Sequence, residues 1–284
     1  MRIKIIYSIV LVFGFIKVWA QDLDSSKYVS LPLDHYFKSL WIDPMQGICS
    51  SGLYAYREEG LVKKGVYFPF VIGAQKELLR KKIDQNHGYE FGFEVASYTQ
   101  FEIITPNGVY QRNLLNIDYR ICMHLNVKNN AWSYRARFFH ESSHLGDDYM
   151  IRNKVHAYLP NPLNYEQLDF TAALEKGRFN YYAGLGAVVR IETIRKRFSA
   201  QTGFSFSFPV NEKARVKYVG GMDLKFLQQT NYDVNAKMCA GFQFGKGDES
   251  PKFVVEFYTG HLPFSLYEYK KVQWLGIGLY FNVI

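Results

Sequence analysis

The stretch that decides the fold is residues 115–126, Leu-Asn-Ile-Asp-Tyr-Arg-Ile-Cys-Met-His-Leu-Asn, in which every second side chain is apolar. Successive side chains of a β-strand point to opposite faces of the sheet, so this segment predicts a strand with one apolar and one polar face. The same alternation recurs over residues 179–189, 200–208, 216–226, 234–244 and 275–283. We therefore predict an all-β protein.

A soluble β-sandwich would also show this alternation, but two features favour a transmembrane β-barrel. The segments run for about 10–14 residues, longer than ordinary soluble strands and long enough to cross a bilayer when tilted. Their polar faces also carry charges of both signs, which a barrel lumen tolerates because opposite charges pair across it. These residues are Glu90, Glu94, Glu102, Asp118, Arg120, Arg135, Arg137, Arg215, Lys217, Asp223 and Lys225. The prediction is a closed, up-and-down antiparallel barrel, which leaves no backbone edge unpaired.

The turn signals predict about twelve strands. Tight turns are indicated at residues 105–108, 129–130, 175–177 and 210–213, and a longer loop at 261–271. The predicted strands lie near residues 48–57, 65–76, 88–104, 110–127, 131–142, 165–175, 178–191, 199–209, 214–227, 234–244, 252–260 and 272–283. Residues 48–284 would thus form the barrel, with a charge-filled lumen too narrow for a wide pore. Residues 21–47 would form a segment at the periplasmic mouth or a plug inside it.

The first twenty residues predict a secretory signal peptide. Arg2 and Lys4 precede an apolar stretch, residues 5–15, and a cleavage site that ends in a small residue follows at 18–20. Lys17 makes the apolar run too short for a membrane anchor. We therefore predict export and insertion into the outer membrane of a Gram-negative bacterium. Membrane lipids and the outer-membrane assembly machinery would be its partners, and the barrel would be a monomer, with a dimer left open.

The composition excludes several other classes. An aromatic content of 17% argues against a disordered chain, and the absence of apolar runs of about 20 residues argues against a polytopic helical membrane protein. Without the signal peptide, 31 basic residues face 26 acidic ones and are dispersed, so no nucleic-acid partner is predicted. Three widely spaced cysteines, Cys49, Cys122 and Cys239, predict buried thiols and no disulfide scaffold.

Residues 140–148, His-Glu-Ser-Ser-His-Leu-Gly-Asp-Asp, gather polar chemistry where the barrel pattern would otherwise continue. One interpretation is a zinc peptidase, because His140-Glu141-x-x-His144 matches H-E-x-x-H. That chemistry needs a helix, which brings both imidazoles to one metal. Here a strand leads directly into the motif, so this alternative is the least favoured.

A second interpretation is nucleophilic catalysis. His140 and Ser142 share one strand face, and the preceding strand, with Trp132 and Phe138 on its apolar phase, puts that face toward lipid. A polar pair facing lipid is unfavourable unless it serves a function, such as hydrolysis of a lipid acyl ester. No metal or other cofactor is required by the sequence, and a calcium requirement is left open.

The segment also resembles the outer-membrane phospholipase A family, whose strand motif is His-Gln-Ser-Asn-Gly. The resemblance implies His140 as general base and Ser142 as nucleophile. The orienting Asn of that family lies fourteen residues after the His, which falls on Lys154 here. Asn153 is one place short, and Asp147 or Asp148 would replace it only with a different geometry.

A third interpretation is structural or ligand-binding. Glu141, His144 and the pair Asp147 and Asp148 would then order the long loop 144–164 through hydrogen bonds. The barrel would bind or pass a small solute, or scaffold the surface. Counting strands from a periplasmic C-terminus puts the motif at the extracellular side, unless residues 149–159 form another strand.

A broader resemblance covers roughly residues 37–190. The segments 114–120 and 132–137 and the motif at 140–149, which includes Ser143 and Gly146, are similar to a bacterial outer-membrane family of unknown function. The hallmark of that family is His-Gln-Ser-Ser-His-Leu-Gly-Asp-Glu. The resemblance implies an exported barrel and no particular activity.

Overall fold

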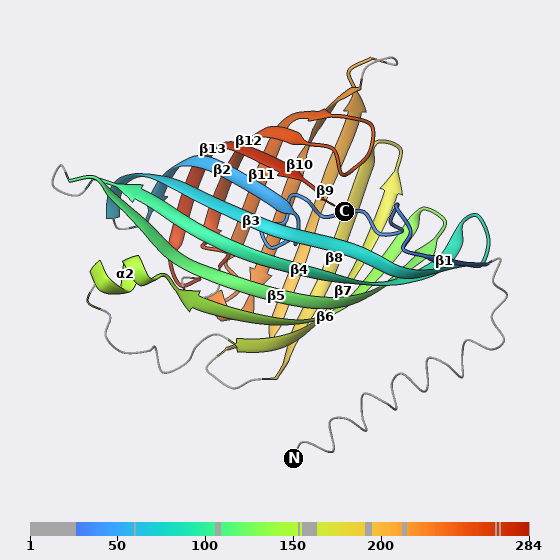
Figure 1. The fold of residues 1–284 in the computed structure, drawn as a ribbon, viewed down its shortest axis with the longest axis horizontal. Coiled ribbons are helices and arrows are strands. Elements are labelled where there is room, and N and C mark those ends of the chain that lie inside the picture. The colour runs from blue at the N-terminus through green and yellow to red at the C-terminus, as the bar shows by residue number, and fades with distance from the viewer. Residues whose placement is uncertain are drawn as a thin grey trace.

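Twelve strands close into a barrel in the part of the chain that the structure describes (Figure 1). The computed structural model describes residues 27–59, 61–105, 109–152, 154, 164–190, 195–211, 215–264, 266 and 268–283. The barrel strands are β2 (Cys49–Glu58), β3 (Leu61–Lys82), β4 (His87–Ile104), β5 (Gln111–Asn129), β6 (Trp132–Leu145), β7 (Asn164–Lys176), β8 (Phe179–Arg190), β9 (Phe198–Pro209), β10 (Val216–Leu227), β11 (Val234–Phe244), β12 (Lys252–His261) and β13 (Lys271–Phe281). Each pairs antiparallel with its neighbours in sequence, and β13 pairs with β2. The predicted closed twelve-stranded antiparallel barrel is confirmed.

The largest difference from the predicted strand limits is in β3, which extends from Leu61 to Lys82 and not only from 65 to 76. Its charged ends resemble a loop in composition. They stay in the sheet because β3 pairs with β4 from Gly65–Ile104 to Lys82–Gly88. Strand β1 (Tyr28–Ser30) adds a short thirteenth strand to β3 at residues 79–81.

The two faces of the sheet differ as the alternation predicts. Apolar side chains on the outer face are open to the surroundings, with Ile121 65% and Leu185 70% exposed, whereas Glu94, Asn116 and Asp118 on the inner face are 0% exposed. Eight of the predicted lumen charges are buried: Glu90, Glu94, Glu102, Asp118, Arg120, Arg135, Arg137 and Asp223. The inner face therefore forms a polar lumen lined by buried charges.

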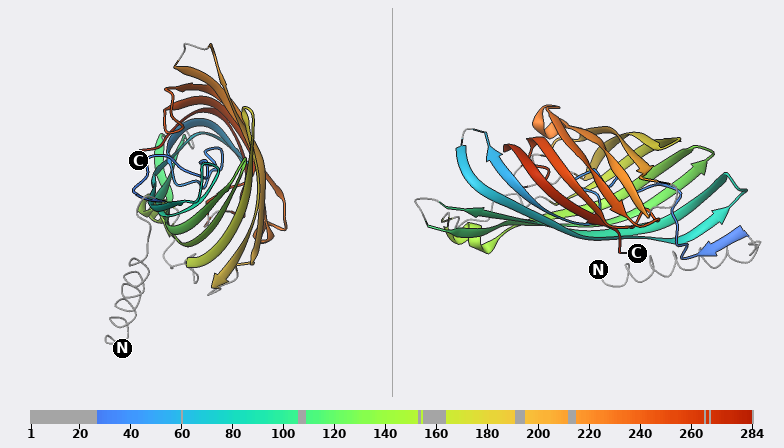
Figure 2. Two further views of the ribbon diagram at one scale, coloured as in Figure 1. Left: turned by 90° about the vertical axis from the view of Figure 1, so that its right-hand side faces the viewer. Right: turned by 90° about the horizontal axis from the view of Figure 1, so that it is seen from above.

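Residues 31–48, here called the plug segment, start at the mouth of the barrel beside β1 and continue into the ring of strands (Figure 2, left). Phe37 and Ile42 of the plug are 0% and 1% exposed, and Asp43 Oδ1 lies 2.7 Å from Lys225 Nζ. Further polar contacts with the wall are Asp34–Arg80, Tyr36–Glu90, Met45–Arg120 and Gln46–Glu94. Because the partners come from several strands, the plug fills the lumen from within. The predicted signal peptide lies outside the described residues.

The two ends of the barrel differ in their connections. Residues 83–86, 130–131, 177–178, 210–215 and 245–251 connect strands at the end where β13 finishes and β2 begins, here called the turn end. The opposite end, here called the loop end, carries the longest connection, residues 146–163, which includes α2 (Asp147–Arg152). Within the described residues, no helix is long and apolar enough to cross a membrane. The three cysteines are unpaired and buried, as predicted.

Candidate functional site

The 140–148 motif begins inside strand β6, close to the loop end. β6 continues to Leu145, so the side chains of the motif alternate between the two faces of the barrel wall. His140, Ser142 and His144 follow the outward phase of β6, and Glu141 and Ser143 are buried on the lumen side. The motif thus consists of two sets of side chains with different surroundings.

The inward set belongs to the lumen network. Glu141 Oε2 accepts a hydrogen bond from Arg120 Nε at 2.8 Å, and Arg120 Nη1 donates to the Met45 carbonyl of the plug at 2.6 Å. Ser143 donates a short hydrogen bond to Asp118. Through Arg120, Glu141 therefore connects the wall to the plug, and the predicted contact between Glu141 and the loop stays a prediction.

This geometry excludes the zinc-peptidase alternative. Along a strand, His140 and His144 are separated by roughly 13 Å, at about 3.3 Å per residue. Glu141 points to the opposite side of the wall and is bound to Arg120. The two imidazoles and the carboxylate cannot meet at one metal, because the motif has strand geometry where the peptidase motif needs a helix.

The outward set faces a neighbouring strand that sequence spacing did not identify. Strand β7 pairs with β6 so that Glu166 lies across from His140 and Asn164 across from Ser142. His140 Nδ1 lies 3.0 Å from Glu166 Oε1, within hydrogen-bond distance. Within the described residues, no hydrogen bond joins His140 to Ser142. The structure thus brings a serine, a histidine and a carboxylate together on the outward face.

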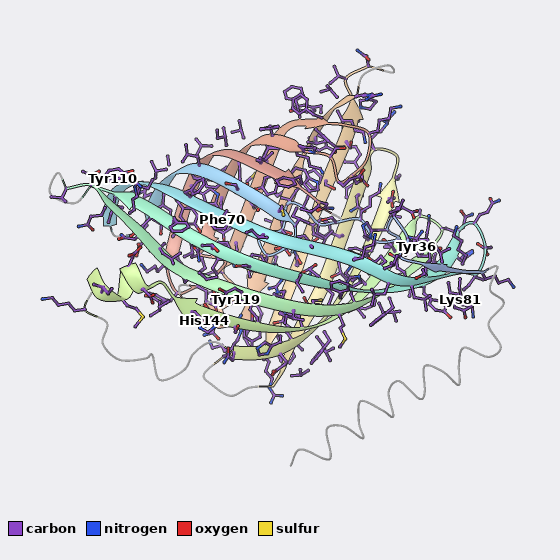
Figure 3. The ribbon with its side chains drawn as sticks, viewed as in Figure 1. Tyr36, Phe70, Lys81, Tyr110, Tyr119 and His144 are labelled. Atoms are coloured by element: carbon purple, nitrogen blue, oxygen red, sulfur yellow. The ribbon has the colours of Figure 1, made fainter. Side chains whose placement is uncertain are left out.

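Aromatic and apolar side chains border this polar group. Tyr119 of β5 lies across from Ser142, and its ring centroid is 5.8 Å from that of His144 (Figure 3). On the side toward the middle of the barrel, the outer face carries Ile121, Phe138 and Leu168, which are 65%, 40% and 50% exposed. The polar group therefore lies at the border between the apolar band and the loop end.

The remaining motif residues form the turn that ends β6. Gly146 donates its N–H to the Leu115 carbonyl, and a Cβ there would lie only 2.1 Å from the Leu114 oxygen, so the close approach requires glycine. Asp147 and Asp148 are exposed in the first turn of α2. No hydrogen bond joins either of them to His140 among the described residues.

The other predicted orienting residue is not placed by the structure. Asn153 lies outside the described residues, so its catalytic role and that of Asp147 stay predictions. Residues 147–152 form a helix, which leaves an even number of spanning strands and puts the motif at the end opposite the C-terminus.

The described residues offer poor metal sites. Calcium takes six to eight oxygen ligands, whereas Glu166 is the one carboxylate described next to His140 and Ser142, and it is bound to the imidazole. In the lumen, ligand atoms of His35, Glu77 and Glu90 lie within 4.8 Å of one another. The Arg80 guanidinium already binds Glu90 there, at 2.7 Å, so its positive charge disfavours a cation.

The fold and the lipid-facing polar group define an outer-membrane β-barrel protein. In bacterial barrels of this class, short turns face the periplasm and longer loops face outward, so the extracellular side stays the predicted location of the motif. The chain belongs to the family described as protein of unknown function DUF1207, which matches residues 17–283. The predicted membership in an outer-membrane barrel family of unknown function is confirmed.

Two solved structures are similar in fold. One is the Salmonella typhi outer membrane phospholipase dimer with bound calcium, at 12% identity and a TM-score of 0.54, over 83% of this chain and 90% of that one. The other is the outer membrane phospholipase A of Escherichia coli, at 11% identity and a TM-score of 0.52, over the same shares. A comparison with curated proteins gives no match.

Proposed function

We propose that the protein is an outer-membrane hydrolase of lipid acyl esters, with Ser142 as nucleophile, His140 as general base and Glu166 as the group that orients the imidazole. The observation that carries this proposal is the contact of 3.0 Å between His140 Nδ1 and Glu166 Oε1 on the lipid-facing side of the wall, beside Ser142. The combination of a nucleophile, a base and a carboxylate that holds the base is the arrangement that activates a serine.

The chemistry follows from this arrangement. With its Nδ1 proton directed to Glu166, His140 presents the Nε2 lone pair and can take the proton of the Ser142 hydroxyl as Oγ attacks the ester carbonyl. Collapse of the tetrahedral intermediate breaks the bond to the leaving alcohol, which receives that proton from His140. Water, activated by the same imidazole, then releases the fatty acid from Ser142. Catalytic hydrogen bonds often tighten only when substrate binds, which applies here to Ser142 and His140.

The amide of Asn164 is suited to stabilise the oxyanion. It lies across from Ser142 in the register of β6 and β7, and its Oδ1 has no hydrogen-bond partner among the described residues. An amide Nδ2 directed at the developing negative charge would act as an oxyanion-hole donor.

The surroundings favour a membrane lipid as substrate. The acyl chains would lie along the apolar side chains of Ile121, Phe138 and Leu168, and the headgroup would lie toward His144 and the loop end. The similar structures include phospholipases, and the shared fold is compatible with such an activity. The extracellular border of the membrane is where these residues could reach an ester bond.

The test is hydrolysis of phospholipid and of a chromogenic acyl ester by refolded full-length protein, with calcium and with EDTA in parallel. Ser142→Ala and His140→Ala should each abolish the activity. Ser97→Ala is the matched control, because Ser97 also lies on the outward phase, two strands away, across from Tyr119. A fluorophosphonate probe should label the wild type and the control but not Ser142→Ala. Activity that survives both active-site changes would sink the proposal, and an inactive, unlabelled wild type would favour a non-catalytic barrel.

A further inference from the structure

A second polar site lies inside the barrel at the turn end, on the opposite side of the wall from the His140 group and at the other end of the molecule. It is a cavity of about 240 Å³ between the plug segment and the lumen faces of strands β8 to β12. This volume corresponds to roughly eight water molecules. Ser39 and Trp41 of the plug form one side, and Asn180 and Gln243 of the wall form the other.

The lining is strongly basic. The cations Lys38, Arg178, Lys217 and Lys252 border the cavity, with Asp248 as the one carboxylate in the lining. Lys38 is already paired with Glu175, at 2.6 Å, so Arg178, Lys217 and Lys252 carry the excess of positive charge. Such an excess of like charge around a small, partly open cavity attracts an anion, because the low-dielectric wall concentrates the field. Among the described residues, Arg178, Lys217 and Lys252 form no ion pair, whereas buried charges deeper in the lumen, such as Arg120 and Glu141, pair with one another.

Several of these cations have N–H groups that are available to a ligand. Lys252 Nζ uses two of its three protons on the Asp248 and Ser250 carbonyls, and Lys217 Nζ uses one on the Lys246 carbonyl. The Arg178 guanidinium forms no hydrogen bond or ion pair with any residue that the structure describes. Between them, the two lysines and the arginine can still offer at least eight N–H donors to a ligand.

Two acceptors in the same cavity lack donors. Asn180 is only 6% exposed, and its Oδ1 accepts no hydrogen bond from any residue that the structure describes. Ser39 Oγ is also buried without a partner among the described residues. Buried polar groups are nearly always hydrogen-bonded, so two orphaned oxygens in one cavity indicate a hydroxylated ligand or ordered water.

We propose that this cavity binds a small, soluble, hydroxylated oxyanion, such as a sugar phosphate or a hydroxy acid, that enters from the periplasm. The basic side chains hold the oxyanion, and hydroxyl groups of the ligand donate to Asn180 Oδ1 and Ser39 Oγ. The plug fills the lumen beyond the cavity, so this is a binding site at the mouth of the barrel. It is independent of the proposed hydrolase.

Calorimetric titration of the refolded full chain tests the site, with glycerol 3-phosphate, inorganic phosphate and glycerol as probes. Glycerol 3-phosphate should bind most tightly, phosphate more weakly, and glycerol not measurably. The double variant Arg178→Gln/Lys217→Gln should weaken binding of both anions at least tenfold, about the effect of losing one charge-assisted hydrogen bond. The matched control is Lys82→Gln/Lys128→Gln, two cations at the same end but outside the cavity lining, and it should bind as the wild type does.

A second variant separates the two halves of the site. Asn180→Leu should weaken glycerol 3-phosphate and leave phosphate nearly unchanged. The proposal is overturned if neither anion binds, or if the Arg178→Gln/Lys217→Gln protein binds like the control. It is also overturned if only phosphatidylglycerol in mixed vesicles binds, since the site would then recognise a lipid headgroup. Heat-modifiable gel mobility establishes that each variant is folded.

Discussion

Replacement of Arg120 by methionine should be among the most damaging single changes in this barrel. The Arg120 side chain is 4% exposed and touches three parts of the molecule. It binds Glu141 through Nε and Nη2, donates to the Met45 carbonyl of the plug, and lies over the Phe139 ring at 4.3 Å. Methionine keeps part of the packing volume and removes every one of these polar contacts.

The magnitude follows from burial. The loss of one partner from a buried ion pair costs about 3–5 kcal/mol, because the other charge stays in a poorly solvated place. Glu141 is 1% exposed, so water cannot easily replace the guanidinium. When both partners become apolar, the penalty largely disappears, and Arg120→Met/Glu141→Met should recover most of the lost stability.

Equilibrium unfolding in urea, with the protein in lipid vesicles, measures both variants against the wild type. Limited proteolysis should also show faster cleavage within residues 31–48 of Arg120→Met, because the plug loses its anchor at Met45. A change below about 1 kcal/mol, or a double variant no more stable than the single one, would refute the reasoning.

Three further predictions concern the plug and the outward site. Burial alone would raise the pKa of Asp43, but the Lys225 ammonium, the Met45 N–H and the Arg137 guanidinium together hold this pKa below its ordinary value. Asp43→Asn should therefore lower the free energy of unfolding by about 2 kcal/mol at pH 7. The difference in this free energy between the variant and the wild type should narrow as the pH falls below about 4, and unfolding curves at several pH values measure it. Glu166→Ala should lower kcat/KM for ester hydrolysis roughly 10²–10⁴-fold with an altered pH profile, and an unchanged profile would count against its orienting role. Gly73→Val should displace the plug, because a Cβ at this position lies 2.5 Å from the Gly47 carbonyl carbon; protease resistance of the plug equal to wild type would contradict this.

The period-two pattern was sufficient to predict the barrel, the strand count and the direction in which His140 and Ser142 point. Alternation is a local property, and one apolar phase per strand fixes which face meets lipid. The alternation could not identify Glu166, the third member of the proposed site. Glu166 follows a connection of residues 146–163, and the register that brings it across from His140 is a property of the β6–β7 pairing. A search at a fixed sequence distance led to Lys154 and its neighbour Asn153, with Asp147 or Asp148 as substitutes of different geometry.

The plug segment shows the same limit. Residues 21–47 have no strand or helix periodicity, so the sequence could indicate only a mouth or plug location. The position of the segment is set by side chains that converge from distant strands, such as Lys225 on Asp43 and Arg120 on the Met45 carbonyl. Such contacts cannot be predicted from local sequence patterns, because they form only when the closed barrel brings distant strands together.

The two faces of β6 explain why polar residues occupy consecutive positions in the motif. A catalytic group that faces lipid uses alternate positions of the strand, here His140 and Ser142. Contacts with the lumen use the other positions, here Glu141 and Ser143. Glu141 and Ser143 bind Arg120 and Asp118, which fixes the backbone of β6 against β5 and the plug. An active-site serine and histidine act only when held within a fraction of an ångström of the productive geometry. We therefore expect the inward residues to act as positioning residues: Ser143→Ala should lower kcat more than it raises KM, although its side chain lies on the opposite side of the wall from the substrate.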